Sequence, residues 1–190
     1  ELEKAKPDIV LSGFDIGANL AVTIAAAHMN IPVAHIQGGE VTGSIDESIR
    51  HAMSKFAHIH FPATELSKQR LIRMGEDPNN IYVVGCPSID VIRETPKLDI
   101  ETLTEYFNLN FEKPVLLMIQ HPVTTEAEDS FLQIKETVDA IREVNVQTVA
   151  LLPNNDAGYS KIIDYIKQSD IKWYPSLPTD IFINLYRNVN

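Results

Sequence analysis

The chain has 190 residues, of which 44% are apolar and 22% charged, a composition typical of a globular protein and not of a disordered one. A formal net charge of −10, with no cluster of Lys or Arg, argues against nucleic-acid binding. One cysteine excludes an internal disulfide and a cysteine-rich zinc site, and no apolar run reaches the length of a membrane span. Since the first residues also lack a signal-peptide pattern, we expect a cytoplasmic protein that does not bind a membrane.

Short apolar runs alternate along the chain with longer segments of helical periodicity. This alternation predicts an α/β fold with a parallel sheet covered on both faces. The predicted strands are 9–12, 32–36, 59–62, 81–84, 115–120, 148–152 and 171–174. The predicted helices are 17–29, 45–57, 65–74, 87–93, 127–143, 158–168 and 179–187. Ser44, with Glu47 three residues later, has the spacing of a capping box, and Thr64 is a second candidate N-cap.

Residues 94–114 interrupt this alternation with two prolines, a charged stretch and a weak helix at 100–107. We interpret the segment as an interdomain connection. It divides the chain into two α/β domains, 1–93 and 94–190, each with three or four strands. Because the chain starts with Glu1 and stops just after a helical pattern, we expect both domains to be incomplete in it.

The segment 35–51, with the sequence HIQGGEVTGSIDESIRH, concentrates ionisable side chains and glycines behind the predicted strand 32–36. Gly38 and Gly39 form the turn that leaves the carboxyl end of this strand, and the next helix follows. In an open α/β sheet, ligands bind at that edge. The segment therefore predicts a functional site, or the rim of one.

Asp15 follows the first predicted strand, between Gly13 and Gly17. A carboxylate in this position either faces the ligand crevice or caps the helix that begins near Gly17, and the local sequence favours the cap. The loop does not have the GxGxxG spacing, so it gives no support for a dinucleotide site.

Asp46, Glu47, Arg50 and His51 fall within two turns of one predicted helix, at separations of three and four residues. Such pairs usually form a solvated charged face. Their place directly after the glycine turn also suits a site, because an arginine can hold a phosphate or carboxylate and a nearby aspartate can act as a base. The local sequence leaves the two interpretations equally open.

The second half repeats this arrangement. Residues 120–125 (QHPVTT) and 153–158 (PNNDAG) each follow a predicted strand, and backbone N–H groups at the helix after the latter can meet an anion. Turn and capping chemistry explains both segments equally well. Together with the loops of the first half, they suggest a ligand bound between the domains.

Other candidate sites have less support. His58 and His60 have a spacing that zinc can use, but further ligands are not evident, and core or edge histidines are the more common case. We therefore expect no metal site. The chain has no Gly-x-Ser-x-Gly elbow, Walker loop or catalytic Cys-His arrangement, so nucleophilic catalysis has no support.

Five segments, in order, resemble the hydrolysing UDP-N-acetylglucosamine 2-epimerases, which supply N-acetylmannosamine or related sugars for pathways of the sialic-acid and legionaminic-acid type. They are KPDIVLSGFD, HIQGGEVTGSIDESIRHAMSKFAHIHFPAT, VGCPSID, QHPVTTE and LPNNDAG, and they cover nearly the whole chain. The resemblance implies two Rossmann-like parallel-sheet domains of the glycosyltransferase-B type, a UDP-N-acetylhexosamine substrate in the cleft between them, no cofactor, and a homodimer or tetramer.

The resemblance also implies a mechanism, in which anti-elimination of UDP gives a 2-acetamidoglucal and water addition then releases N-acetylmannosamine. This needs a base near the C2 proton and stabilisation of the departing diphosphate. Asp15, Asp46 and Arg50 match the family's catalytic positions, and His121 matches its diphosphate-contacting histidine. Asn154 matches an asparagine near the uridine. Gln37 and Glu40 lie beside these residues and are expected to contact substrate.

Two departures from the family pattern stand out. Where many members have Gly-Asp-Arg, this chain has Phe14-Asp15-Ile16, and a substrate-contacting guanidinium is absent. Where some members have a glutamate, this chain has Gln37, which forms hydrogen bonds but cannot take a proton. If that glutamate is a required base, catalysis is lost; if Asp15 and Asp46 share the work, Gln37 orients the sugar.

The family's first strand and loop, and its later Gly-Asn-Ser-Ser loop, have no counterpart in residues 1–190, so we expect this segment alone to be inactive or nearly so. Three alternatives remain for the whole protein. It acts on UDP-N,N'-diacetylbacillosamine, it binds a nucleotide sugar without turnover, or it is a non-hydrolysing epimerase. The last is disfavoured because HIQGGE with SIDESIRH resembles the hydrolysing branch.

Overall fold

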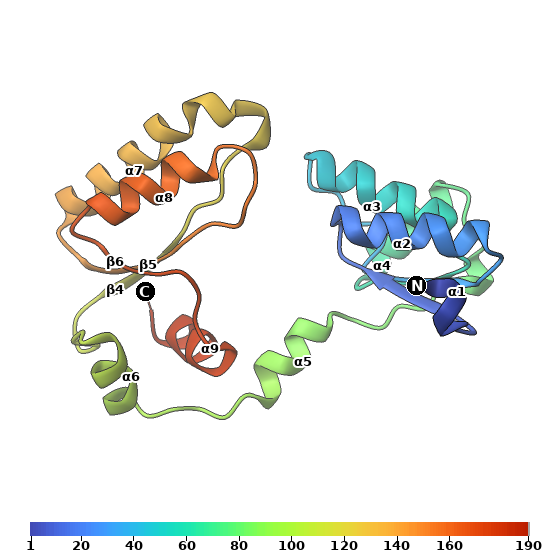
Figure 1. Ribbon diagram of the computed structural model, residues 1–190. Helices are drawn as coiled ribbons and strands as arrows, with labels where there is room; N and C mark the ends of the chain where they lie inside the picture. Colours follow the sequence, from blue (N-terminus) through green and yellow to red (C-terminus); the bar gives the residue numbers. More distant parts are fainter. Residues whose placement is uncertain (190) are drawn as a thin grey trace. The chain divides into compact units, whose positions relative to one another are not determined.

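The computed structural model describes residues 1–189. They form two compact units, unit 1 (Glu1–Val91) and unit 2, which begins at Ile92. Within the described residues, each unit contains one parallel sheet of three strands (Figure 1). None of the described helices is both long enough and apolar enough to cross a bilayer.

The sheet of unit 1 has the order β1 (Val10–Gly13), β2 (Val33–Ile36), β3 (Ile59–Phe61), and helices α2 (Gly17–His28) and α3 (Ile45–Phe56) pack against it (Figure 1). Val10, Ala26 and Val33 form its apolar core. The remaining helices of unit 1 are α1 (Leu2–Ala5), α4 (Glu65–Arg73) and the 3₁₀ turn η1 (Pro78–Asn80). Helix α5 (Pro87–Glu94) spans the boundary between the two units, at Val91 and Ile92.

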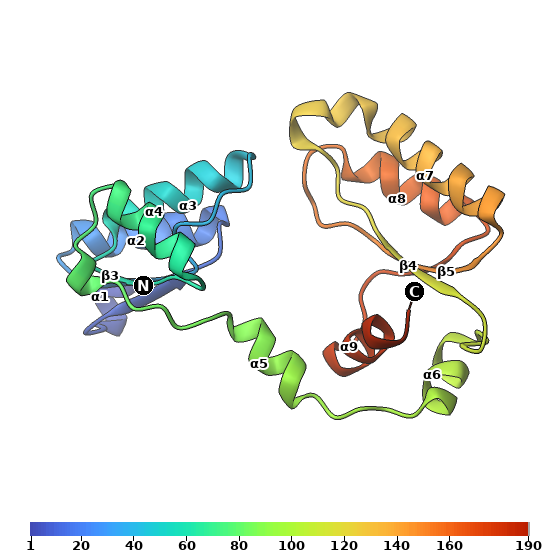
Figure 2. The ribbon, with the colours of Figure 1, turned by 180° about the vertical axis from the view of Figure 1, so that it is seen from behind.

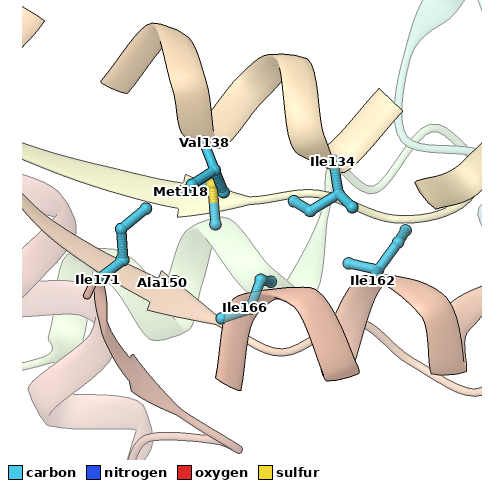
Figure 3. Packing of buried hydrophobic residues seen from close by; sticks show 7 residues of the cluster. All are labelled: Met118, Ile134, Val138, Ala150, Ile162, Ile166 and Ile171. Atoms are coloured by element: carbon cyan, nitrogen blue, oxygen red, sulfur yellow. The ribbon is translucent and has the colours of Figure 1, made fainter. Parts of the chain in front are cut away.

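Unit 2 has the strand order β4 (Val115–Ile119), β5 (Gln147–Leu151), β6 (Lys172–Tyr174). Its helices α7 (Ser130–Val144) and α8 (Tyr159–Gln168) cover one face of the sheet, and α6 (Ile100–Phe107) and α9 (Thr179–Asn188) lie on the other (Figures 1 and 2). Figure 3 shows the core between α7, α8 and the sheet. It consists of Met118, Ile134, Val138, Ala150, Ile162, Ile166 and Ile171.

Two predicted helix starts are confirmed by their caps. The Ser44 hydroxyl accepts a hydrogen bond from the Asp46 N–H at 3.3 Å, and the Thr64 hydroxyl accepts one from the Ser67 N–H at 3.1 Å. These bonds satisfy backbone donors that the first turn of a helix otherwise leaves without partners.

Three predictions about the elements are wrong. Residues 81–84 form no strand: they run along β3, with a single bridge between Ile81 and His60, and Tyr82, Val83 and Val84 are exposed. The helix predicted at 100–107 is confirmed as α6, but it is not part of an interdomain connection, because Leu103 and Phe107, four apart on it, are buried in the core of unit 2. The helix predicted to begin at residue 127 is α7, and it begins only at Ser130. The residues before it form the 3₁₀ segment η2 (Thr124–Asp129).

Candidate functional site

Asp15 and Arg50, two of the predicted catalytic residues, form an ion pair in unit 1. Arg50 lies on α3 and is 6% exposed. Its Nη2 contacts the Asp15 carboxylate, and its Nη1 donates to the carbonyl oxygen of Glu40 at 2.9 Å. Asp15 does not cap α2, because the N-cap residue is Ile16 and no side chain bonds to that helix end. The capping interpretation of Asp15 is therefore wrong. Arg50 instead joins the loop after β1 to the loop after β2.

Asp46 lies one helical turn before Arg50, and its side chain is exposed. Its carboxylate accepts a hydrogen bond from the Ser44 hydroxyl at 3.0 Å. The two predicted catalytic carboxylates thus have different environments. Asp15 is held by a buried guanidinium, whereas Asp46 is accessible to a ligand.

Glu47 holds the loop between β2 and α3. Its Oε2 accepts hydrogen bonds from the backbone N–H groups of Thr42 at 2.9 Å and Gly43 at 2.8 Å. These bonds lower the pKa of the Glu47 carboxyl. In a standard capping box, the Glu47 carboxylate would accept from the Ser44 N–H. The predicted capping box is therefore right about the helix start at Ser44, but wrong about the partner of Glu47. His51 Nε2 lies 3.7 Å from Glu47 Oε1.

The Gly38–Gly39 turn is packed closely against its surroundings. Gly39 has φ +81, and a Cβ there would lie 2.3 Å from the Ser67 carbonyl oxygen. This position therefore requires glycine for both its conformation and its space. Arg70 from α4 donates to the Gly39 carbonyl oxygen at 3.3 Å. Two arginines, Arg50 and Arg70, thus fix the carbonyl groups of consecutive residues in this turn.

Gln37 lies at the carboxyl end of β2 in the left-handed region, with φ +60. Its N–H donates to the Phe61 carbonyl oxygen at 2.9 Å, and its side-chain Nε2 donates to Cys86 Sγ at 3.1 Å. The thiol therefore determines how the amide is oriented, a role for Cys86 that sequence reasoning missed. A cysteine in the loop before α5 carries no local signal for such a contact.

The two histidines that were weighed as zinc ligands have other partners. His58 Nδ1 accepts a hydrogen bond from the Val33 N–H at 3.2 Å. His60 is 1% exposed, its Nε2 lies 3.3 Å from Glu76 Oε2, and Lys55 Nζ lies 2.7 Å from Glu76 Oε1. Burial lowers the pKa of His60, although Glu76 opposes the shift. No group of three potential ligands for a metal ion occurs among residues 1–189.

Unit 2 brings its two predicted ligand residues together. His121 follows β4, Asn154 follows β5, and the His121 Nδ1 and Asn154 Oδ1 atoms are 3.1 Å apart. Both side chains are exposed. Parallel neighbouring strands end at the same edge of a sheet, which explains why loops 33 residues apart meet there.

The family profile described as UDP-N-acetylglucosamine 2-epimerase matches residues 1–190. The chain belongs to the UDP-N-acetylglucosamine 2-epimerase family. Among curated relatives, the chain is 40% identical over 190 residues to the UDP-N,N'-diacetylbacillosamine 2-epimerase (hydrolyzing) of Legionella pneumophila. It is 33% identical over 189 residues to the UDP-N-acetylglucosamine 2-epimerase of Neisseria meningitidis serogroup B. Each alignment covers 98% of this chain and 50% of the relative, so the chain spans about half the length of these proteins.

Solved structures agree with the fold of this chain. The crystal structure of the Neisseria meningitidis UDP-GlcNAc 2-epimerase bound to UDP-GlcNAc matches with a TM-score of 0.84 at 23% identity, covering 100% of this chain and 54% of that one. The Methanocaldococcus jannaschii enzyme, in complex with UDP-GlcNAc and UDP, matches with a TM-score of 0.81 at 21% identity. The predicted fold class is confirmed: the chain has two Rossmann-like parallel-sheet units of the glycosyltransferase-B type.

Proposed function

We propose that the whole protein is a hydrolysing 2-epimerase, which converts a UDP-linked 2-acetamido hexose to UDP and the free sugar inverted at C2. The observation that carries this proposal is the pair of carboxylates on unit 1. Asp15 is held in place by Arg50 at the carboxyl edge of the sheet, and Asp46 is exposed one turn earlier on α3. Family membership and the 40% identity to a hydrolysing relative support the reaction type.

In the proposed reaction, a carboxylate removes the C2 proton while the C1–O bond to UDP breaks, and a C1=C2 double bond forms. Water then adds across this bond, with hydroxyl at C1 and a proton at C2 on the opposite face. We assign the acid and base roles to Asp15 and Asp46. Arg50 contributes by fixing Asp15, since its guanidinium is already engaged with that carboxylate and the Glu40 carbonyl oxygen.

The substrate contacts are proposed as follows. We assign Gln37 a hydrogen bond to the sugar. It has no acid–base role, because its amide cannot take up the C2 proton. Glu40 contacts substrate from the same turn. His121 contacts the diphosphate, and Asn154, which meets His121 at 3.1 Å, lies near the uridine. The proposed elimination and water addition involve proton transfers and no change that requires a redox cofactor, and we propose that no metal or organic cofactor takes part. We further propose that the protein works in the cytoplasm as a homodimer or tetramer.

The reaction can be followed by proton and phosphorus NMR with the whole protein in deuterated buffer. UDP-N-acetylglucosamine is the first substrate. Release of UDP and of N-acetylmannosamine with deuterium at C2 is the expected result. Formation of UDP-N-acetylmannosamine would indicate a non-hydrolysing epimerase, and binding without any product would indicate that Gln37 marks a protein that only binds the nucleotide sugar.

A second substrate is favoured by one observation: of the two relatives compared above, the one with the higher identity is named as a UDP-N,N'-diacetylbacillosamine 2-epimerase. The same assay with this diacetylated sugar, at equal concentration, decides between the substrates through the ratio of kcat/KM values. A ratio above about 10 in favour of the diacetylated sugar would make it the substrate, since one pocket contact to the extra acetamido group is worth about that much.

A further inference from the structure

His35 lies in the middle of unit 1, on β2, and is 1% exposed. It is the cross-strand neighbour of Ser12 on β1 and of His60 on β3. Its Nδ1 lies 3.1 Å from the Ser54 hydroxyl on α3. The strand that leads to the glycine turn is therefore tied directly to the helix that carries Asp46 and Arg50. Neither the proposed acid–base chemistry nor the substrate contacts use this histidine.

The direction of the His35–Ser54 hydrogen bond follows from proton counting. The Ser54 hydroxyl has one proton, which it donates to the Arg50 carbonyl oxygen at 3.1 Å. Towards His35, Ser54 can only accept, so His35 Nδ1 carries a proton and donates it. Burial lowers the pKa of His35 to about 4, so the ring is neutral at pH 7 and Nε2 has no proton. Within residues 1–189, Nε2 is buried and has no hydrogen-bond partner.

The glycine turn packs against the same bond. A Cβ at Gly38 would lie 2.9 Å from His35 Nδ1, closer than real Cβ atoms come, and 3.0 Å from Ser54 Oγ, tighter than nearly all real Cβ contacts. The absence of a side chain at Gly38 thus leaves room for the histidine and the serine to meet. Strand β2, the Gly38–Gly39 turn and helix α3 therefore meet at the His35–Ser54 contact. Ser54 lies one helical turn after Arg50 on α3.

We propose that His35 is a positioning residue for the Asp15–Arg50 pair: its Nδ1–H group holds Ser54 and thereby sets helix α3 at the depth from which Arg50 reaches Asp15 and the Glu40 carbonyl group. This inference rests on the proposed 2-epimerase activity. It assigns His35 a defined tautomer and a defined partner, and both can be tested separately from turnover.

The tautomer is tested in the whole protein labelled with ¹⁵N-histidine, by long-range ¹H–¹⁵N correlation at pH 7. We expect His35 to carry its proton on Nδ1, and Ser54→Ala to shift its Nδ1 resonance. A proton on Nε2 would overturn the proposal, whether or not the protein turns over substrate. If this spectrum agrees but wild-type protein converts neither UDP-sugar, the proposed function fails and the positioning contact stands.

The kinetic test uses two amide variants. In His35→Asn, the side-chain N–H₂ replaces Nδ1 and can still donate to Ser54; in His35→Gln, it replaces Nε2 and points away. We expect His35→Asn to keep kcat within about fivefold of wild type. We expect His35→Gln and Ser54→Ala to lose about 10- to 100-fold in kcat with a smaller change in KM, as for a misplaced catalytic group.

Thr23→Val is the matched control. The Thr23 hydroxyl on α2 donates to the buried Ser12 hydroxyl on β1 at 2.9 Å, so this variant also removes a buried bond between a helix and a strand, but does not involve α3. Equal losses of kcat in Ser54→Ala and Thr23→Val would show a general effect of lost stability and overturn the proposal. So would equal kcat values in His35→Asn and His35→Gln. If neither His35 variant folds, Ser54→Ala against Thr23→Val decides.

Discussion

Arg50 forms an ion pair with Asp15, which lies 35 residues earlier in the chain. The guanidinium is buried, and it holds the carboxylate after β1 and the Glu40 carbonyl group after β2 at the same time. A planar group with several donors in a fixed fork can serve two acceptors in this way. Arg50 therefore fixes two loops relative to each other at the carboxyl edge of the first sheet, where we propose the site.

Arg50→Lys should therefore damage the site although it keeps the charge. The lysine ammonium is a compact point charge and cannot replace the guanidinium at both acceptors. We expect kcat/KM to fall about 100-fold, and the free energy of unfolding to fall by about 1 kcal/mol because the partly buried Glu40 carbonyl oxygen loses its donor. Enzyme assays and urea unfolding measure both. Arg73→Lys, at an exposed position of α4, is the control. Near-normal activity in Arg50→Lys would contradict the proposal that the guanidinium must bind both acceptors.

Asp46→Asn should reduce the activity of the enzyme without reducing its stability. Asparagine can still accept the hydrogen bond from the Ser44 hydroxyl, but it cannot take up a proton. We expect kcat to fall by about 10²- to 10⁴-fold, with the free energy of unfolding unchanged to within about 0.5 kcal/mol. Glu65→Gln, an exposed acidic residue in the first turn of α4, is the matched control and should be active. An active Asp46→Asn enzyme would remove Asp46 from the acid–base pair.

Glu47 should control the order of the loop formed by residues 41–44. Hydrogen bonds from the Gly43 and Thr42 N–H groups favour the ionised carboxylate and lower its pKa below the ordinary 4.5. The stabilisation is therefore present above pH 4.5 and is lost as the pH falls through the lowered pKa. We expect Glu47→Gln to reduce the hydrogen-exchange protection of these amides by up to about tenfold at pH 7. Unchanged protection would show that the loop is held by other contacts.

His35 makes a separate contribution to the pH dependence of stability. Its pKa is lowered from 6.5 to about 4 in the folded protein, mainly by burial, so the unfolded chain binds the proton more readily. The contribution of neutral His35 to stability is therefore fully present above pH 6.5, and it is lost as the pH drops from 6.5 towards 4. The difference in unfolding free energy between wild type and His35→Asn should shrink by about 3 kcal/mol between pH 7 and pH 4. A constant difference, measured by urea unfolding, would contradict this.

The His121–Asn154 contact should matter for UDP binding. Asn154 Oδ1 orients the imidazole, so Asn154→Ala and His121→Ala should each weaken UDP affinity by about tenfold, and the double variant by much less than a hundredfold. Isothermal titration with UDP measures these values. Asn155→Ala, at the exposed neighbouring position, is the control and should bind UDP normally. Fully additive losses would show that the two side chains act independently.

Much of the fold could be read from the sequence because its signals are local. Apolar runs predicted the six observed strands to within one or two residues, and Ser44 and Thr64 marked the starts of α3 and α4. Residues 81–84 have the same apolar character as a strand, yet only Ile81 bridges to β3. The segment does have a neighbour, since the Tyr82 and Val84 N–H groups donate to the His60 and Pro62 carbonyl oxygens, but the pairing does not extend into a regular ladder. The apolar character of a segment does not show how far its pairing extends. Residues 100–107 were interpreted as a weak helix in a connection, because the partners that bury Leu103 and Phe107 lie on β5 and α9, far away in the sequence.

The sequence by itself determined that polar residues would follow the strands of both sheets, since the alternation of strands and helices puts those loops at one edge. Only the tertiary structure decided their roles. The local sequence favoured Asp15 as the cap of α2, but Arg50, from a distant helix, is its partner. In the same way, the proton on His35 depends on Ser54 donating to Arg50. Ion pairs and tautomers are properties of groups brought together in space, and local sequence does not contain that information.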